Sequence, residues 1–185
     1  ASDTIRPVTP GIGGSPAAAI FLANGADVQL AGVSRQLLGD GWPAASPFQY
    51  AGSIGPIPLD DSLAKQIEQI GSVLTAQFGL RGLFGVDGLI RDNQFWTVEV
   101  NPRYTASVEV LERAGAGALL GRHAAVFGVQ SHNDLRTDLP QRSSRTMHGK
   151  AIVFSDAPVR IGRAFAALVE RWNGASGVPT LADIP

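Results

Sequence analysis

The 185-residue sequence predicts an α+β fold in which an antiparallel β-sheet is backed by helices. Two pairs of strand-like segments indicate hairpins: residues 17–24 with 27–38, and residues 83–91 with 95–101. Between the pairs, residues 60–78 carry apolar side chains at helical spacing, which indicates an amphipathic helix. These features predict strands that pair with their neighbours along the chain and a helix that covers the sheet.

The first predicted hairpin turns at Asn24-Gly25, a dipeptide typical of tight turns. In the predicted helix, Asp60 and Asp61 stand where carboxylates can cap free N–H groups, and Gly79 stands where a helix ends. The apolar stripe of this helix repeats every three or four residues, and we expect it to lie in the core. Its members are Leu63, Ile67, Ile70, Leu74 and Phe78.

The remaining segments are shorter. We expect strands at 48–54 and 151–155, helices at 107–114, 117–127 and 162–172, and loops at 1–16, 39–47 and 131–146. These expectations divide the chain into an irregular N-terminal segment (1–16), a main domain (17–130) and a C-terminal part (131–185). The C-terminal part combines a loop with a partial β-rich extension.

Composition excludes several classes of protein. With 15 basic and 16 acidic residues the net charge is −1 and no basic stripe stands out, so nothing predicts a nucleic-acid or anionic-membrane partner. The absence of cysteine excludes disulfides, thiolate nucleophiles and cysteine-ligated metals, and it fits a cytoplasmic protein. No apolar run approaches the ~18 residues that a membrane span needs.

The common short motifs of catalysis are missing too. No phosphate-binding P-loop occurs, because Gly149-Lys150 lacks the upstream glycine spacing. Neither a complete GxGxxG fingerprint nor a GxSxG nucleophile motif is present. The three histidines do not have zinc-ligand spacing, so each is expected to be an ordinary surface or hydrogen-bonding side chain.

The second predicted hairpin carries the informative polar residues. With a three-residue loop at its tip, residue 91 pairs with 95, and Asp87 then pairs with Glu99 on the face that also carries Asn101. In this register Trp96 shares the opposite face with Val98 and Val100, and we expect Trp96 to be buried.

Two carboxylates directly opposite each other repel, so a cation is expected to neutralise them. Asp87, Glu99 and Asn101 offer only oxygen ligands, which suit a hard divalent ion such as Mg²⁺ or Mn²⁺. Arg103 follows closely enough to present a guanidinium to a phosphate. The same pattern also fits an ordinary solvated strand face on which Asp87 and Glu99 point apart.

At these residues the chain resembles the ATP-grasp superfamily. The segment GVDGLIRDNQFWTVEVNPRYTASVEV is similar to the family's pattern of an aspartate on one strand and E-x-N-P-R on the next. The resemblance extends over most of residues 14–155 and is strongest over 82–109. It implies the C-terminal lobe of an ATP-grasp domain of the carboxylate–amine ligase type, here incomplete.

The resemblance also implies roles for single residues. The Mg²⁺ ligands fall on Asp87, Glu99 and Asn101, and the arginine that contacts phosphate or the activated substrate falls on Arg103. Leu89 and Val98 match positions that line the adenine pocket. Arg35 and Gln36 resemble polar residues that face the site in relatives, although a surface role fits them equally well.

As a whole, the resemblance implies part of an ATP-dependent ligase that joins a small-molecule carboxylate to an amine by way of an acylphosphate, with ATP and Mg²⁺ (or Mn²⁺) as cofactors. Only Lys65 and Lys150 are lysines, and no counterpart of the family's phosphate-binding lysines is present. The missing N-terminal lobe of the same protein is therefore an expected partner. The alternatives are a non-catalytic nucleotide-binding or degenerate ATP-grasp module, and a plain interaction domain without a metal.

Overall fold

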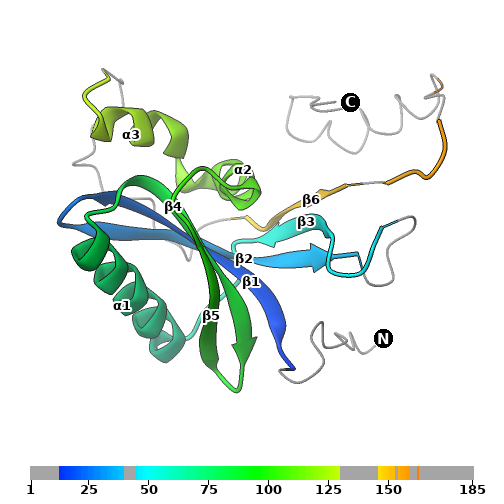
Figure 1. Cartoon of the computed structure of the whole chain (residues 1–185), viewed down its shortest axis with the longest axis horizontal. Helices are drawn as coiled ribbons and strands as arrows, with labels where there is room; N and C mark the ends of the chain where they lie inside the picture. The colour runs from blue at the N-terminus through cyan, green and yellow to red at the C-terminus, as the bar shows by residue number, and fades with distance from the viewer. Residues whose placement is uncertain (1–12, 40–44, 130–145, 153, 159–161, 163–185) are drawn as a thin grey trace. The chain divides into compact units, whose positions relative to one another are not determined.

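The computed structural model describes residues 13–39, 45–129, 146–152, 154–158 and 162, and Figure 1 shows its elements. The chain divides into two units, Ala1–Val153 and Phe154–Pro185, and every described helix and strand lies in the first. The expectations for the N-terminal loop up to residue 12 and for most of the helix at 162–172 fall outside the described residues.

The predicted antiparallel sheet is confirmed and has six strands in the order β5-β4-β1-β2-β3-β6. The strand predicted at 151–155 lies three residues earlier and pairs with β3. Gly52 of β3 permits this pairing, because its φ is +140° and any Cβ there would collide with the carbonyl oxygen of Lys150. The strands are β1 (Ser15–Asn24), β2 (Val28–Leu38), β3 (Tyr50–Gly55), β4 (Arg81–Arg91), β5 (Gln94–Asn101) and β6 (His148–Ala151).

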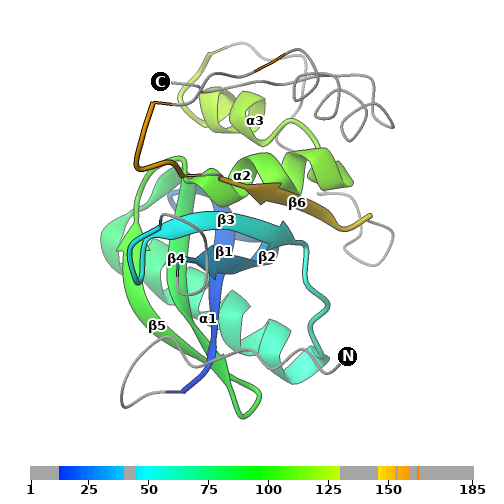
Figure 2. The ribbon, with the colours of Figure 1, turned by 90° about the vertical axis from the view of Figure 1, so that its right-hand side faces the viewer.

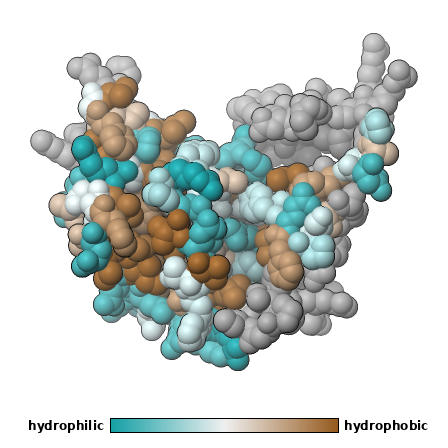
Figure 3. All heavy atoms as spheres, in the orientation of Figure 1, coloured by the Kyte–Doolittle hydropathy of each residue, from teal (hydrophilic) through white to brown (hydrophobic). Residues whose placement is uncertain are grey.

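Helix α1 (Asp61–Phe78) covers one face of the sheet, as predicted (Figure 1). The Asp60 carboxylate caps it by accepting a hydrogen bond from the Leu63 N–H at 2.8 Å, and Gly79 ends it with φ +60°. The prediction that Phe78 belongs to the core is wrong. This side chain is 72% exposed, because Gly71 and Thr75 occupy the positions on α1 that face the sheet. Apolar side chains gather over α1 on the face seen in Figure 3.

The opposite face of the sheet is covered by α2 (Ala106–Leu111), the π-helical turn η1 (Glu112–Ala116) and α3 (Leu119–Val126) (Figure 2). The two faces have separate apolar cores. Strand β1 supplies Phe21 to the core under α1 and Ile20 and Leu22 to the core under α2 and α3. None of the helices among the described residues is long and apolar enough to cross a membrane.

Replacing Gly71 with alanine should destabilise the protein, although the same change inside an exposed helix is stabilising by about 1 kcal/mol. A Cβ at this position would collide with the ring of Phe21, which is fully buried and stacks on Phe84 at 4.9 Å. We expect a net loss of roughly 1–2 kcal/mol from overpacking. Urea unfolding of Gly71→Ala beside Ser72→Ala, an exposed neighbour, checks this. An increase in stability for Gly71→Ala would contradict the packing.

Candidate metal and nucleotide site

The β4–β5 hairpin pairs Asp87 with Glu99, as predicted, but its turn is shorter than predicted and one of its strands has a bulge. The tip is a two-residue turn at Asp92 and Asn93, whose φ angles of 49° and 59° suit a tight hairpin, so Arg91 pairs with Gln94. Such a turn alone would place Asp87 opposite Val98. A β-bulge at Val98 adds one residue to β5 and brings Glu99 opposite Asp87.

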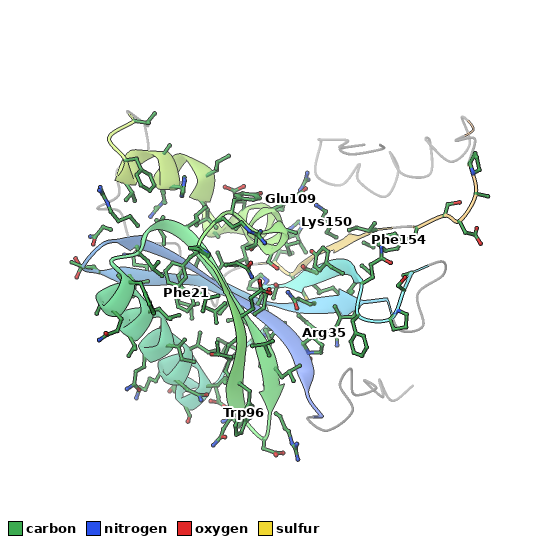
Figure 4. All side chains as sticks on the ribbon, viewed as in Figure 1. Phe21, Arg35, Trp96, Glu109, Lys150 and Phe154 are labelled. Carbon is green, nitrogen blue, oxygen red and sulfur yellow. The ribbon has the colours of Figure 1, made fainter. Side chains whose placement is uncertain are left out.

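The bulge also overturns the prediction that Trp96 is buried. Between the hairpin tip and the bulge, each residue of β5 lies on the face opposite to the one predicted. Phe95 therefore points into the core under α1 and is 4% exposed. Trp96 pairs with Leu89 near the hairpin tip and is 50% exposed (Figure 4). Because Leu89 lies two residues from Asp87 on β4, Trp96 shares the face of the carboxylates and not that of Val100.

Asp87 is held by side-chain amides on both of its oxygens. Gln36 Nε2 donates to Oδ1 and Asn101 Nδ2 donates to Oδ2, each at 3.0 Å. The Asn101 oxygen in turn accepts from the Arg103 guanidinium at 2.9 Å. The backbone N–H of Arg103 donates to the Asn101 carbonyl at 2.8 Å, which turns the chain back toward the site. We call Gln36, Asp87, Asn101 and Arg103 the Asp87 network.

The electrostatics of this site favour an added cation. Burial raises the pKa of Asp87, and the Glu99 carboxylate opposite raises it further, against the opposing effects of Gln36, Arg103 and Asn101. Among the described residues, the Glu99 side chain makes no hydrogen bond or ion pair. The described residues therefore compensate the negative charge of this pair only in part.

The donor set fits Mg²⁺ or Mn²⁺. Two carboxylates and an amide oxygen supply hard ligands, and Mg²⁺ usually takes only one or two carboxylates and completes its shell with water or phosphate oxygens. The Asn101 oxygen keeps a second lone pair besides the one that accepts from Arg103. Within the described residues, no group of three or more His, Cys, Asp or Glu side chains could hold a metal ion, so a site here needs the amide and such outside oxygens.

The structure brings together Asp87, Glu99, Asn101 and Arg103 but not Arg35. Arg35 precedes Gln36 in β2, so its side chain points to the other face of the sheet (Figure 4). Leu89 is buried on the face of Asp87, and Val98 is the bulged residue and 71% exposed. The predicted nucleotide contacts of Leu89, Val98 and Arg35 stay predictions.

A polar cluster beside α2 is missing from the sequence-based prediction. Lys150 of β6 donates to Glu109 of α2 at 2.8 Å, and the two lie together in Figure 4. Tyr50 is half-buried, and its hydroxyl hydrogen-bonds Ser53 at 2.6 Å. Burial raises the pKa of Tyr50, whose electrostatic neighbours include Lys150, Glu109 and Asp87. No short motif could have revealed this cluster, because its members come from three separate elements.

A sequence model of the ATP-grasp domain matches residues 8–107, which is more than half of the chain. The chain belongs to the ATP-grasp family. The matched range includes the whole β4–β5 hairpin and Arg103, so the family assignment and the candidate site rest on the same segment. The assignment confirms the resemblance seen in the sequence.

Solved structures show the same fold. A single-chain, multi-domain long-chain acyl-CoA carboxylase is 23% identical with a TM-score of 0.54, over 74% of this chain and 14% of that one. The urea carboxylase of Kluyveromyces lactis is 14% identical with a TM-score of 0.54, over 72% of this chain and 12% of that one. This ATP-grasp chain therefore spans a small part of the length of both proteins. The comparison with curated proteins finds none that matches.

Replacing Glu99 with glutamine should stabilise the metal-free protein near neutral pH by about 0.5 kcal/mol, because it removes a like charge opposite Asp87 in a partly solvated pair. The raised pKa of Asp87 means that the folded state binds more protons than the unfolded state above the ordinary pKa of 3.8. The contribution of Asp87 to the stability of the unsubstituted protein therefore falls as pH rises through this window.

The increase in the free energy of unfolding caused by Glu99→Gln should accordingly appear as pH rises and vanish below pH 3.8. Urea unfolding in EDTA at neutral and acid pH measures it, with Glu68→Gln as control, because α1 covers the face of the sheet away from Asp87. An equal gain at both pH values would show that the Asp87–Glu99 repulsion is not its cause.

Proposed function

We propose that this ATP-grasp chain is part of an ATP-dependent ligase that activates a carboxylate as an acylphosphate and joins it to an amine. The observation that carries the proposal is the pairing of Asp87 with Glu99 beside Asn101 and Arg103 on the hairpin of an ATP-grasp fold. Together these side chains offer oxygen ligands for a cation and a guanidinium for an anion. Phosphoryl transfer uses both, because a metal ion and a cationic side chain stabilise the charge on the phosphate oxygens.

Asp87, Glu99 and Asn101 would hold Mg²⁺ or Mn²⁺. When bound there, the ion supplies positive charge to the phosphate oxygens of ATP. The protein's own contribution is to keep the ligands in place: Asp87 and Glu99 are fixed opposite each other by strand pairing, and Asn101 is fixed by hydrogen bonds on both sides of its amide. Leu89 and Val98 would contact adenine, and Arg35 is a further candidate for contact with the nucleotide.

Arg103 would be the catalytic residue. Its side chain is anchored by Asn101 and by the Tyr104 carbonyl at 3.3 Å, yet the residue stays exposed, so its guanidinium can reach a ligand. A fixed cation beside the transferring phosphoryl group or the acylphosphate stabilises the charge that develops in the transition state. None of the residues described here needs to act as a general base.

The rest of the ligase would come from outside the described lobe. The chain covers 14% and 12% of the two carboxylases, and only Lys65 and Lys150 are lysines, so a further lobe of the same protein would supply cations for the phosphates. The substrates would be a small carboxylate and an amine, with no nucleic-acid or membrane partner. A cytoplasmic location stays a prediction.

ADP formation by the natural full-length protein, assayed with ATP, Mg²⁺ and panels of carboxylates and amines, tests the proposal. We expect ADP release that depends on one carboxylate, with hydroxylamine able to replace the amine because it traps an acylphosphate. Binding of Mg·ADP without any carboxylate-dependent turnover would instead support a non-catalytic nucleotide-binding module.

A further inference from the structure

Gln36 reaches Asp87 across an entire strand. Strand β1 lies between β2, which carries Gln36, and β4, which carries Asp87, so the two residues are not on neighbouring strands. The residue of β1 opposite Asp87 is Ala18, whose side chain is a single methyl group. From β2, the Gln36 side chain donates to Asp87 Oδ1 at 3.0 Å.

The two side-chain amides that donate to Asp87 come from strands at different places in the sheet. Asn101 comes from β5, the strand at the edge of the sheet, whereas Gln36 comes from β2 inside the sheet, paired on both sides. One hydrogen bond on each oxygen fixes the rotation of the carboxylate, and each oxygen keeps a lone pair for another ligand. Gln36 thus ties the Asp87 carboxylate to the interior of the sheet.

We propose that Gln36 is a positioning residue for the metal ion, an inference that rests on the metal site of the proposed function. Its amide holds the Asp87 carboxylate in the orientation that receives the ion, together with Glu99 and Asn101. Preorganised ligands bind more tightly because their side chains lose less freedom when the ion arrives.

The chemistry of the amide suits this role better than that of a charged group. A lysine or arginine at position 36 would neutralise Asp87 and compete with the ion, and a carboxylate would add repulsion to the Asp87–Glu99 pair. An aliphatic side chain would leave Oδ1 without its donor. A neutral donor orients Asp87 and leaves its charge available.

Substitution of Gln36 with leucine tests the inference, with Gln66→Leu as a matched control. Gln66 of α1 also binds the sheet through its side chain, because its Oε1 accepts from the Phe95 N–H at 2.8 Å, but it lies on the face away from Asp87. The probe is Mn²⁺ alone, with the free ion measured by electron paramagnetic resonance, and thermal unfolding is recorded on the same samples.

We expect Gln36→Leu to raise the Kd for Mn²⁺ by about tenfold or more, as loss of an outer partner of a metal ligand does. Gln66→Leu should leave this Kd unchanged and lower the unfolding temperature. An unchanged Kd for Gln36→Leu, with Mn²⁺ still bound by the unsubstituted chain, would overturn this inference alone. If the unsubstituted chain bound no Mn²⁺, the metal site of the proposed function would fail and the inference with it.

A second measurement does not depend on the folding of a variant. In the ¹⁵N-labelled unsubstituted chain, Mg²⁺ should shift the side-chain amide signals of Gln36, since its acceptor becomes a metal ligand, and leave those of Gln66 in place. Signals of Gln36 that stay unmoved while Mg²⁺ binds would contradict a positioning role.

Discussion

Replacing Asp87 with alanine should abolish tight Mn²⁺ binding and raise the Kd by more than about a hundredfold, beyond the effect of losing an outer partner. The change removes the carboxylate of the site that accepts hydrogen bonds on both oxygens, and it leaves Glu99 as an exposed carboxylate on an edge strand. Titration of Mn²⁺ followed by electron paramagnetic resonance measures the loss directly and needs no knowledge of the substrate.

The control for this change is Asp92→Ala. Asp92 lies on the same hairpin, but its carboxylate pairs with Arg91 at 3.1 Å and is 83% exposed, so its loss should leave the Kd for Mn²⁺ unaltered. Similar losses in both variants would mean that the ion is attracted by the general charge of the hairpin. A normal Kd for Asp87→Ala would remove Asp87 from the metal site.

Replacing Arg103 with alanine should lower kcat by about 10²–10³-fold and change the KM for ATP only slightly. A loss of this size is typical when a fixed donor to developing charge is removed, because its interaction strengthens in the transition state. The steady-state rate of carboxylate-dependent ADP formation by the natural full-length protein, measured over a range of ATP concentrations, separates the two parameters.

Arg91→Ala is the matched control for Arg103. Arg91 is an exposed arginine near the tip of the same hairpin, and its guanidinium is paired with Asp92 and not with the Asp87 network. We expect Arg91→Ala to keep full turnover. Equal losses of kcat and of ATP affinity in Arg103→Ala would place Arg103 in nucleotide binding and not in catalysis.

Local signals were sufficient for most of the fold. The hairpin dipeptide Asn24-Gly25, the apolar spacing of α1 and its capping residue Asp60 each act within a few residues, and the structure contains the turn, helix and cap they predict. The core position predicted for Phe78 is wrong because the apolar spacing misses Gly71 and Thr75, which are the buried residues of this half of α1.

The register of the site hairpin shows where local reasoning is limited. Glu99 was predicted opposite Asp87 from a three-residue loop, whereas the structure combines a two-residue turn with a bulge at Val98. With the bulge, Phe95 packs in the core under α1 and Glu99 still lies opposite Asp87. Strict alternation along β5 does not predict a bulge, and it therefore places Trp96 on the wrong face.

The contact of Gln36 with Asp87 depends on the order of strands. The two residues are 51 positions apart and meet only because β1 alone lies between β2 and β4, with the small residue Ala18 opposite Asp87. The sequence marked both Arg35 and Gln36 as polar, but it could not say which one shares the face of Asp87. Pairing of the strands decides in favour of Gln36.

Crystals of the protein grown or soaked with MnCl₂ and ADP test the metal site most directly, because the anomalous signal of manganese locates the ion without reference to the refined protein atoms. We predict one manganese peak about 2.1 Å from oxygens of Asp87, Glu99 and Asn101, with phosphate oxygens of ADP on its open side. ADP bound with its metal elsewhere, or with Asp87 and Glu99 pointing away from the ion, would contradict the site.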